Sequence, residues 1–148
     1  MTTTLSQPTT TTTTPAAARP SAQARALAAT RVVVSFLFVC HGLQGTFGAF
    51  GGVDGQGTAV PFGVWPYWWA GVIELVAGVL VGIGLFTRIA ALLCSGAMAF
   101  AYFTVHLPTA LLPLANGGEP AALYSWIFLL IAVTGPGAYA LDRLRTKS

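Results

Sequence analysis

The sequence predicts an all-α membrane protein, an antiparallel bundle of four transmembrane helices with both termini cytoplasmic. Three observations support this fold class. Hydrophobic residues make up 55% of the 148 residues and charged residues only 7%. Four apolar segments are separated by breaks that contain glycine, proline or charge. In a four-span arrangement all seven Lys and Arg residues fall on one side, which is the pattern of cytoplasmic segments.

The first membrane helix is expected from about Leu27 to Phe47, after a disordered tail over residues 1–24. The tail consists mainly of Thr, Pro and Ala, which cannot bury enough apolar surface to offset the entropy lost on ordering. Arg31 lies inside the apolar run and could snorkel back to the interface. No small-residue cleavage site follows the run, so it is interpreted as a helix and not as a cleaved signal peptide.

The second helix, Tyr67–Phe86, is the most informative segment of the chain. It contains no Lys, Arg or Pro and would span about 30 Å, the thickness of a hydrocarbon core. Its one charged residue is Glu74, and a carboxylate at that depth costs about 2–3 kcal/mol, so it should face protein or a watery cavity. Gly71, Gly78 and Gly82 share the face of Glu74, which predicts a close approach of another helix there.

Two more helices complete the predicted bundle. A tight turn at Thr87-Arg88 leads into a third helix, about Ile89–His106, and the fourth runs from about Ala121 to Thr134. The transmembrane domain is expected to cover residues 25–141. Residues 142–148 then form a basic cytoplasmic tail.

A polar pocket is expected in the outer half of the membrane. By helix rise, Glu74 lies about 19 Å and Tyr102 about 21 Å from the inner interface, with His41 about 14–21 Å from it. Glu74 is the candidate proton acceptor and His41 its candidate relay. A structural interpretation is also open, in which Glu74 pairs with His41 or hydroxyls and only holds the bundle together. The candidate ligand-binding residues are Gln44, Tyr102, His106 and Glu119.

Several classes of site are disfavoured. No basic run interleaved with aromatic residues indicates nucleic-acid binding, and no CxxC, P-loop or GxGxxG motif occurs. No metal site is predicted. A bis-His haem would need His41 and His106 at one height on facing helices, and their predicted depths differ.

Cys40 and Cys94 lie in opposite halves of the membrane, so we expect free thiols.

The order of several short motifs resembles that of the DoxX family, over about Arg31 to Arg143. The motifs are His41–Gln44 (HGLQ), Phe47–Gly52 (FGAFGG), Glu74–Gly78 (ELVAG), Gly84–Arg88 (GLFTR), Met98–Leu107 (MAFAYFTVHL), Asn116–Glu119 (NGGE), and Gly135–Gly137 (GPG) followed by Leu141-Asp142. The resemblance implies a four-helix bacterial plasma-membrane (inner-membrane) protein linked to redox chemistry. Relatives are subunits of quinone-reducing or terminal-oxidase complexes, or membrane partners of proteins that detoxify oxidants. Gly45 stands where the family often has a Lys, so a role that needs this cation is in doubt.

The leading hypothesis for function is therefore a membrane subunit or partner of a redox system, embedded in the lipid bilayer beside one or more protein partners. Its outer-half pocket would bind a quinone or a small thiol oxidant. Two alternatives remain open: a non-catalytic membrane scaffold, and a small proton-coupled transporter.

Overall fold

The structure is a computed structural model that describes residues 19–145. Helix α1 (Ala22–Phe47) begins with a cap in which the Ser21 hydroxyl accepts a hydrogen bond from the Ala24 N–H at 3.1 Å. It ends at Gly48, whose φ of 70° favours glycine. The helix thus starts five residues earlier than Leu27, the predicted start. Residues 22–24 of the predicted tail are helical, and residues 1–18 lie outside the described part.

A short 3-10 helix, η1 (Ala49–Gly51), follows, and then a loop that leads to α2 (Tyr67–Ile83). Helix α2 ends three residues before its predicted end, because Gly84 takes the left-handed conformation and closes the helix. The turn between α2 and the next helix therefore lies at residues 84–86, just before the predicted Thr87-Arg88 turn.

Helix α3 (Thr87–Ala101) continues directly into a π-helical turn, η2 (Tyr102–His106). A short helix α4 (Pro113–Asn116) then precedes α5 (Glu119–Thr134), which has a proline in its first turn and ends at Gly135. The last described element is α6 (Asp142–Arg145). Residues 19–145 contain no β-strand, only one isolated bridge between Gly52 and Thr58.

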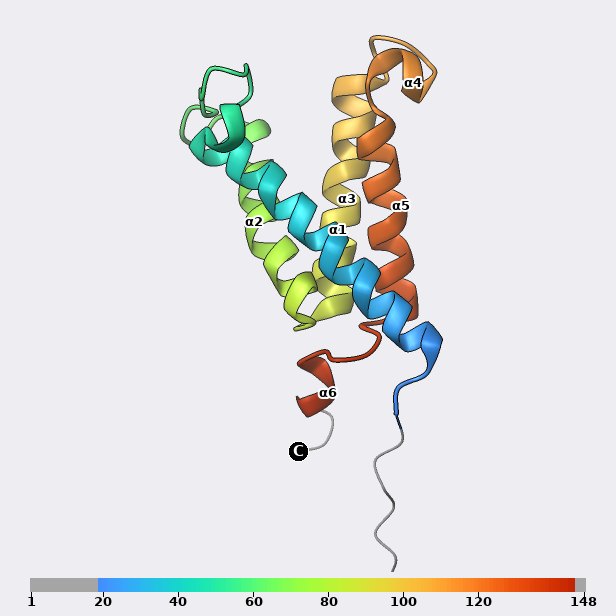
Figure 1. Ribbon diagram of the computed structural model, residues 1–148. Helices are drawn as coiled ribbons and strands as arrows, with labels where there is room; N and C mark the ends of the chain where they lie inside the picture. The colour runs from blue at the N-terminus through green and yellow to red at the C-terminus, as the bar shows by residue number, and fades with distance from the viewer. Residues whose placement is uncertain (1–18, 146–148) are drawn as a thin grey trace, which may run out of the picture.

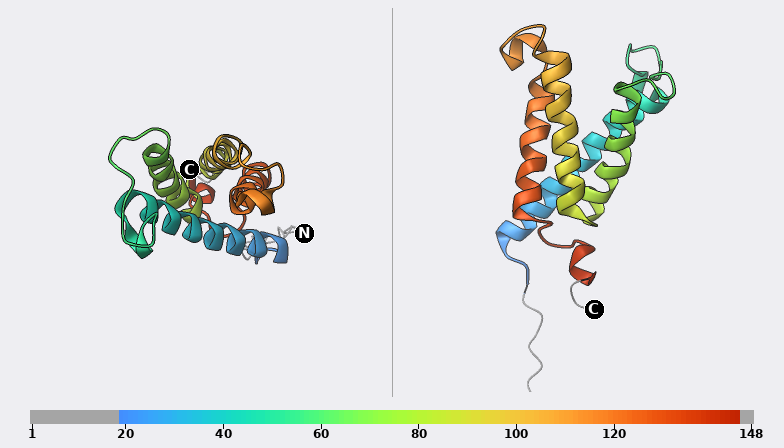
Figure 2. Two further views of the ribbon diagram at one scale, coloured as in Figure 1. Left: turned by 90° about the horizontal axis from the view of Figure 1, so that it is seen from above. Right: turned by 180° about the vertical axis from the view of Figure 1, so that it is seen from behind.

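The four longer helices form two pairs (Figure 1). Helix α1 packs along α2, α3 packs along α5, and α2 also contacts α3. Figures 1 and 2 show that the two pairs diverge towards the end that carries η1 and α4 and converge at the other end. The start of α1 and the short α6 both lie at the converging end. We call the two ends the open end and the closed end.

The core is formed where the pairs converge. Phe38, Val81, Cys94, Phe128 and Ile131 are completely buried there. The Phe38 ring lies 4.7 Å from the Phe128 ring between centroids and joins α1 to α5. These contacts fix the relative positions of the two pairs.

Glycines allow α1 and α2 to approach closely. A Cβ atom added to Gly78 would lie 3.0 Å from Val39 Cγ2, and one added to Gly82 would lie 3.3 Å from Ser35 Cβ. The close contact predicted from the glycine stripe of α2 is confirmed.

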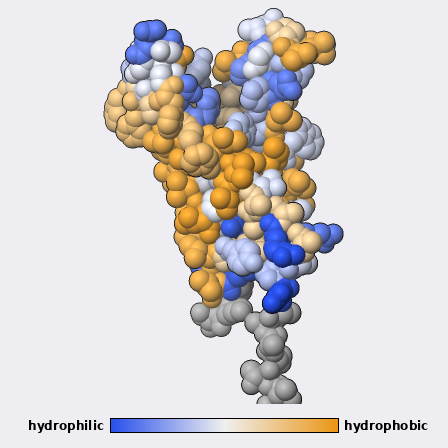
Figure 3. All heavy atoms as spheres, viewed as in Figure 1, coloured by the Kyte–Doolittle hydropathy of each residue, from blue (hydrophilic) through white to orange (hydrophobic). Residues whose placement is uncertain are grey.

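The outer surface of the bundle is largely apolar. Figure 3 shows hydrophobic residues over the middle of the molecule and hydrophilic residues gathered towards its ends. By length and composition, α1 and the continuous segment Thr87–His106 are each able to cross a membrane, whereas α2 and α5 are apolar but shorter. The described chain is thus mainly helical, with membrane-helix character.

The prediction that Arg31 snorkels to the interface is wrong. Its side chain is only 2% exposed and points into the closed end. The guanidinium donates to the carbonyl oxygens of Pro136 and Tyr139, in the segment after α5. Arg31 therefore connects α1 to the segment after α5. The two carbonyl groups lie outside the helices, so they need hydrogen-bond donors from elsewhere in the chain.

Candidate functional site: a cavity between the helix pairs

Glu74 lies on α2, at a close contact between that helix and α1. Gly42 of α1 makes room for it, since a Cβ atom on Gly42 would stand 2.9 Å from Glu74 Cβ. The glutamate is 5% exposed, and among residues 19–145 no hydrogen bond or ion pair reaches its carboxylate. A buried acid without a partner is costly, which is why its surroundings matter.

A cavity of about 670 Å³ opens beside Glu74, between the diverging helix pairs. Its size falls in the range of small-molecule sites. Both pairs contribute to the wall, which includes polar or titratable residues from α1, α2, η2 and α5 and apolar residues between them. The polar or titratable members are Cys40, His41, Gln44, Tyr67, Glu74, His106 and Tyr124.

Four of the six predicted site residues line this cavity: His41, Gln44, Glu74 and His106. His41 is exposed on the wall. The Gln44 amide also donates a 2.9 Å hydrogen bond to the Gly52 carbonyl, and so holds the turn after α1. His106 Nδ1 lies 3.1 Å from the Asn116 carbonyl, which orients the ring.

The other two predicted residues do not line the cavity. The Tyr102 hydroxyl lies 3.5 Å from the Leu111 carbonyl, and its ring packs beside Gly118. Glu119 is exposed at the first position of α5, where a negative charge complements the helix dipole.

Three polar or titratable lining residues were not predicted as site residues: Cys40, Tyr67 and Tyr124. Cys40 precedes His41 on α1 and is partly buried, and Tyr124 lies on α5 with its ring 5.4 Å from Phe38 between centroids. For Cys40 a signal existed, its position beside His41, but the aromatic-rich α5 sequence does not distinguish Tyr124 from a packing residue.

The described residues include no group of three or more His, Cys, Asp or Glu side chains that could hold a metal ion. Both cysteines are free thiols, as predicted, with Cys94 fully buried. The cavity therefore has several side chains that can form hydrogen bonds or exchange protons, and the rest of its lining is apolar.

The fold and the cavity together define a class: a helical protein with membrane-helix character, whose two helix pairs border a cavity that Glu74 lines. The family model described as DoxX matches residues 26–107. The chain belongs to the DoxX family. It is also 42% identical, over 123 residues, to an uncharacterized protein of Haemophilus influenzae, an alignment that covers 78% of this chain and 87% of that one. No solved structure matches the chain.

Proposed function

We propose that the chain is a four-span protein of the bacterial plasma (inner) membrane with both termini in the cytoplasm. The arrangement of charge supports this topology. Every Lys and Arg that the structure describes lies at or near the closed end, just before α1 or in its first ten residues, at the start of α3, or in α6. The open end then faces outward. The transmembrane domain covers residues 25–141, with residues 1–24 and 142–148 on the cytoplasmic side.

We further propose that the cavity at the open end binds a quinone for a redox system. The observation that carries this proposal is Glu74, a buried acid without a partner on the wall of a cavity large enough for a ring ligand. A quinone headgroup offers carbonyl oxygens to hydrogen-bond donors and an apolar ring to the walls. Glu74, when protonated, is such a donor, and Tyr124 lies on the α5 side of the same cavity.

The proposed role of the chain is to hold the quinone and exchange its protons. Reduction of a quinone to a quinol takes up two electrons and two protons. In this proposal a protein partner of the same redox system supplies the electrons. Glu74 delivers one proton to a carbonyl oxygen and is reprotonated through His41, which is exposed on the cavity wall, and the second proton reaches the other carbonyl oxygen from water at the open end.

Quinone titration of the purified full-length protein tests this proposal. A water-soluble short-chain ubiquinone should bind in a saturable manner. Glu74→Leu should weaken binding by about two- to tenfold, because Leu offers no donor in place of a neutral hydrogen bond worth about 0.5–1.5 kcal/mol. Glu119→Leu is the matched control, because that carboxylate lies outside the cavity lining and should leave affinity unchanged.

The same titration separates the alternatives. A wild-type protein that binds no quinone, but retains its protein partners in both Glu variants, would be a scaffold. Uptake of a solute driven by a proton gradient and abolished by Glu74→Gln would instead indicate a transporter. Either result would replace the quinone proposal.

A further inference from the structure

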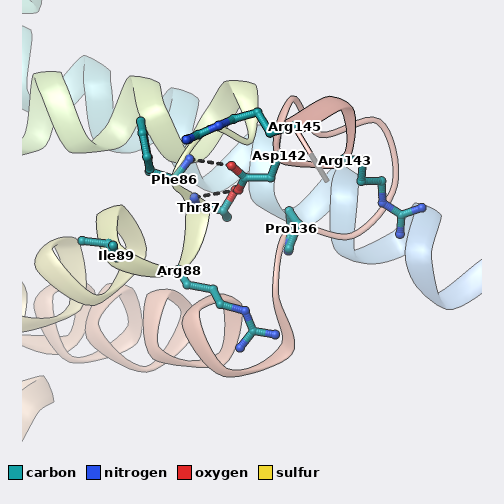
Figure 4. A pocket seen from close by; sticks show the side chains of 8 residues that line it. All are labelled: Phe86, Thr87, Arg88, Ile89, Pro136, Asp142, Arg143 and Arg145. Atoms are coloured by element: carbon teal, nitrogen blue, oxygen red, sulfur yellow. Dashed lines mark hydrogen bonds between the residues drawn. The ribbon is translucent and has the colours of Figure 1, made fainter. Parts of the chain in front are cut away.

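A second cavity, of about 630 Å³, lies at the closed end, away from Glu74. It is bounded by the turn before α3, the first turn of α3, the segment after α5, and α6 (Figure 4). Segments far apart in the chain thus meet around it. The cavity plays no part in the proposed quinone site.

Its lining carries an excess of positive charge. Three guanidinium groups line it, those of Arg88, Arg143 and Arg145, against the one carboxylate of Asp142. Figure 4 shows the arginine side chains spread around Asp142 and not meeting at one point. This spacing suits a ligand with several acceptor oxygens more than a small ion held at a single centre.

The carboxylate is already engaged by the protein. Asp142 accepts hydrogen bonds from the backbone N–H groups of Phe86 and Thr87 at 2.8 and 2.9 Å, and from the Thr87 hydroxyl at 2.7 Å. Arg88 uses Nη1 to bind the Ala132 and Val133 carbonyls at the end of α5. A guanidinium has five N–H donors, so Arg88 retains donors for a ligand.

The rim of the cavity is apolar on the side of the bundle. Ile89 is 66% exposed and the Phe86 side chain 49% exposed, with the Arg145 guanidinium 4.3 Å from the centroid of the Phe86 ring. Apolar residues on the bundle side and arginines on the end together match a molecule with a charged headgroup and a hydrocarbon tail.

We propose that this cavity binds the phosphate headgroup of an anionic phospholipid at the cytoplasmic face of the membrane. Arginine pairs with phosphate oxygens through directed hydrogen bonds, and basic pockets between membrane helices at this face recognise anionic headgroups. The acyl chains would run along Ile89 and Phe86. The lipid would thereby bridge α3 to the C-terminal segment.

Thermal unfolding of the full-length protein in nanodiscs tests the proposal. Discs of phosphatidylcholine alone are compared with discs in which about a fifth of the lipid is phosphatidylglycerol. The wild-type melting temperature should rise with the anionic lipid, and the double variant Arg143→Gln/Arg145→Gln should lose at least half of that rise. Arg25→Gln is the matched control, since it removes an exposed charge of the same end that does not line the cavity, and it should keep the full rise.

Three outcomes would overturn the proposal. One is an equal rise in the wild type and the double variant. Another is an equal loss in Arg25→Gln, which would mean general charge attraction to the surface. The third is a full rise with inorganic phosphate in phosphatidylcholine discs, which would make the site an anion site without a lipid. If the double variant does not fold, the single variant Arg143→Gln is used, with the same expectation in the same direction.

Discussion

Asp142 caps helix α3 from 55 positions further along the chain, through hydrogen bonds from the Thr87 backbone N–H at 2.9 Å and from its hydroxyl at 2.7 Å. No residue before α3 supplies a side-chain cap, because Phe86 stands at the cap position. The C-terminal segment therefore satisfies donors that the helix start leaves open. Two of the short motifs quoted above, Gly84–Arg88 and Leu141-Asp142, are in contact for this reason.

We predict that Asp142→Asn lowers the free energy of unfolding by about 1–2 kcal/mol, because the amide keeps only one of the two oxygen acceptors that Phe86 and Thr87 bind and loses the charge that strengthens these hydrogen bonds. Partial desolvation raises the pKa of the Asp142 carboxyl. The donors of Thr87 and Phe86 outweigh that effect, so the pKa lies below its ordinary value of 3.8. A lowered folded-state pKa stabilises the fold above the unfolded value of 3.8, and this contribution is lost as the pH falls through the lower folded-state pKa.

Denaturation of the wild type and Asp142→Asn in parallel, at neutral pH and at decreasing acidic pH, checks this prediction. The difference in stability between the two proteins should shrink as the pH falls below 3.8, because the protonated Asp142 carboxyl of the wild type and the amide of the variant are then both uncharged. A difference that is absent at neutral pH would show that Asp142 is not a cap.

The α1–α2 contact gives a second prediction. Gly78→Leu should lower the free energy of unfolding by about 1–3 kcal/mol, because its side chain would meet Val39 and Phe38, which already lie 3.0 and 3.3 Å from a Cβ atom at that position. Gly96→Leu is the matched control, since nothing lies within 4 Å of a Cβ atom there. Equal stability of the two variants in the same lipid or detergent would contradict the close packing.

The thiols give a third prediction. Cys40 lines the cavity at the open end, whereas Cys94 is completely buried in the core. A membrane-impermeant maleimide applied from outside should therefore label Cys40 faster than Cys94, and a bound short-chain ubiquinone should slow the labelling of Cys40. Peptide mapping after timed labelling provides the two rates. Faster labelling of Cys94, or no protection by quinone, would argue against an outward quinone cavity.

The proposed topology gives a fourth prediction. Reporters fused before Met1 and after the C-terminus should both be active in the cytoplasm, and one inserted beside Asp54 should be active outside, because the open-end loop carries Asp54 and no Lys or Arg. Asp54 is a suitable position, since its side chain is exposed. An external C-terminus would eliminate the four-span arrangement.

The fold could be predicted from the sequence where a local signal was strong. The unbroken apolar run of α2, and the glycines and prolines that end the helices, determine the four longer helices to within a few residues. The position of the Arg31 side chain was predicted wrongly, because a guanidinium group in an apolar helix can satisfy its donors in two ways. It can extend to the membrane interface, or it can be buried against carbonyl oxygens. Only the tertiary position of Pro136 and Tyr139 selects burial.

The site was predictable in part for a similar reason. Glu74, His41 and Gln44 lie on two helices whose crossing follows from glycine spacing, and they line one cavity. Tyr102 was assigned by its spacing from Met98 and His106, but Ala101 and Val105 line the cavity beside these two residues, and Tyr102 lies next to that face. Helical spacing alone allows either Ala101 or Tyr102 on that face.

The central claim is that the Glu74 carboxyl group touches the bound quinone, and infrared difference spectroscopy tests it most directly. Spectra of the full-length protein with and without a short-chain ubiquinone should show a shift of a carboxyl C=O band. The account predicts that this shift is present in the wild type and in Glu119→Gln and absent in Glu74→Gln. An unchanged carboxyl region on quinone binding, or the same shift in Glu74→Gln, would contradict it.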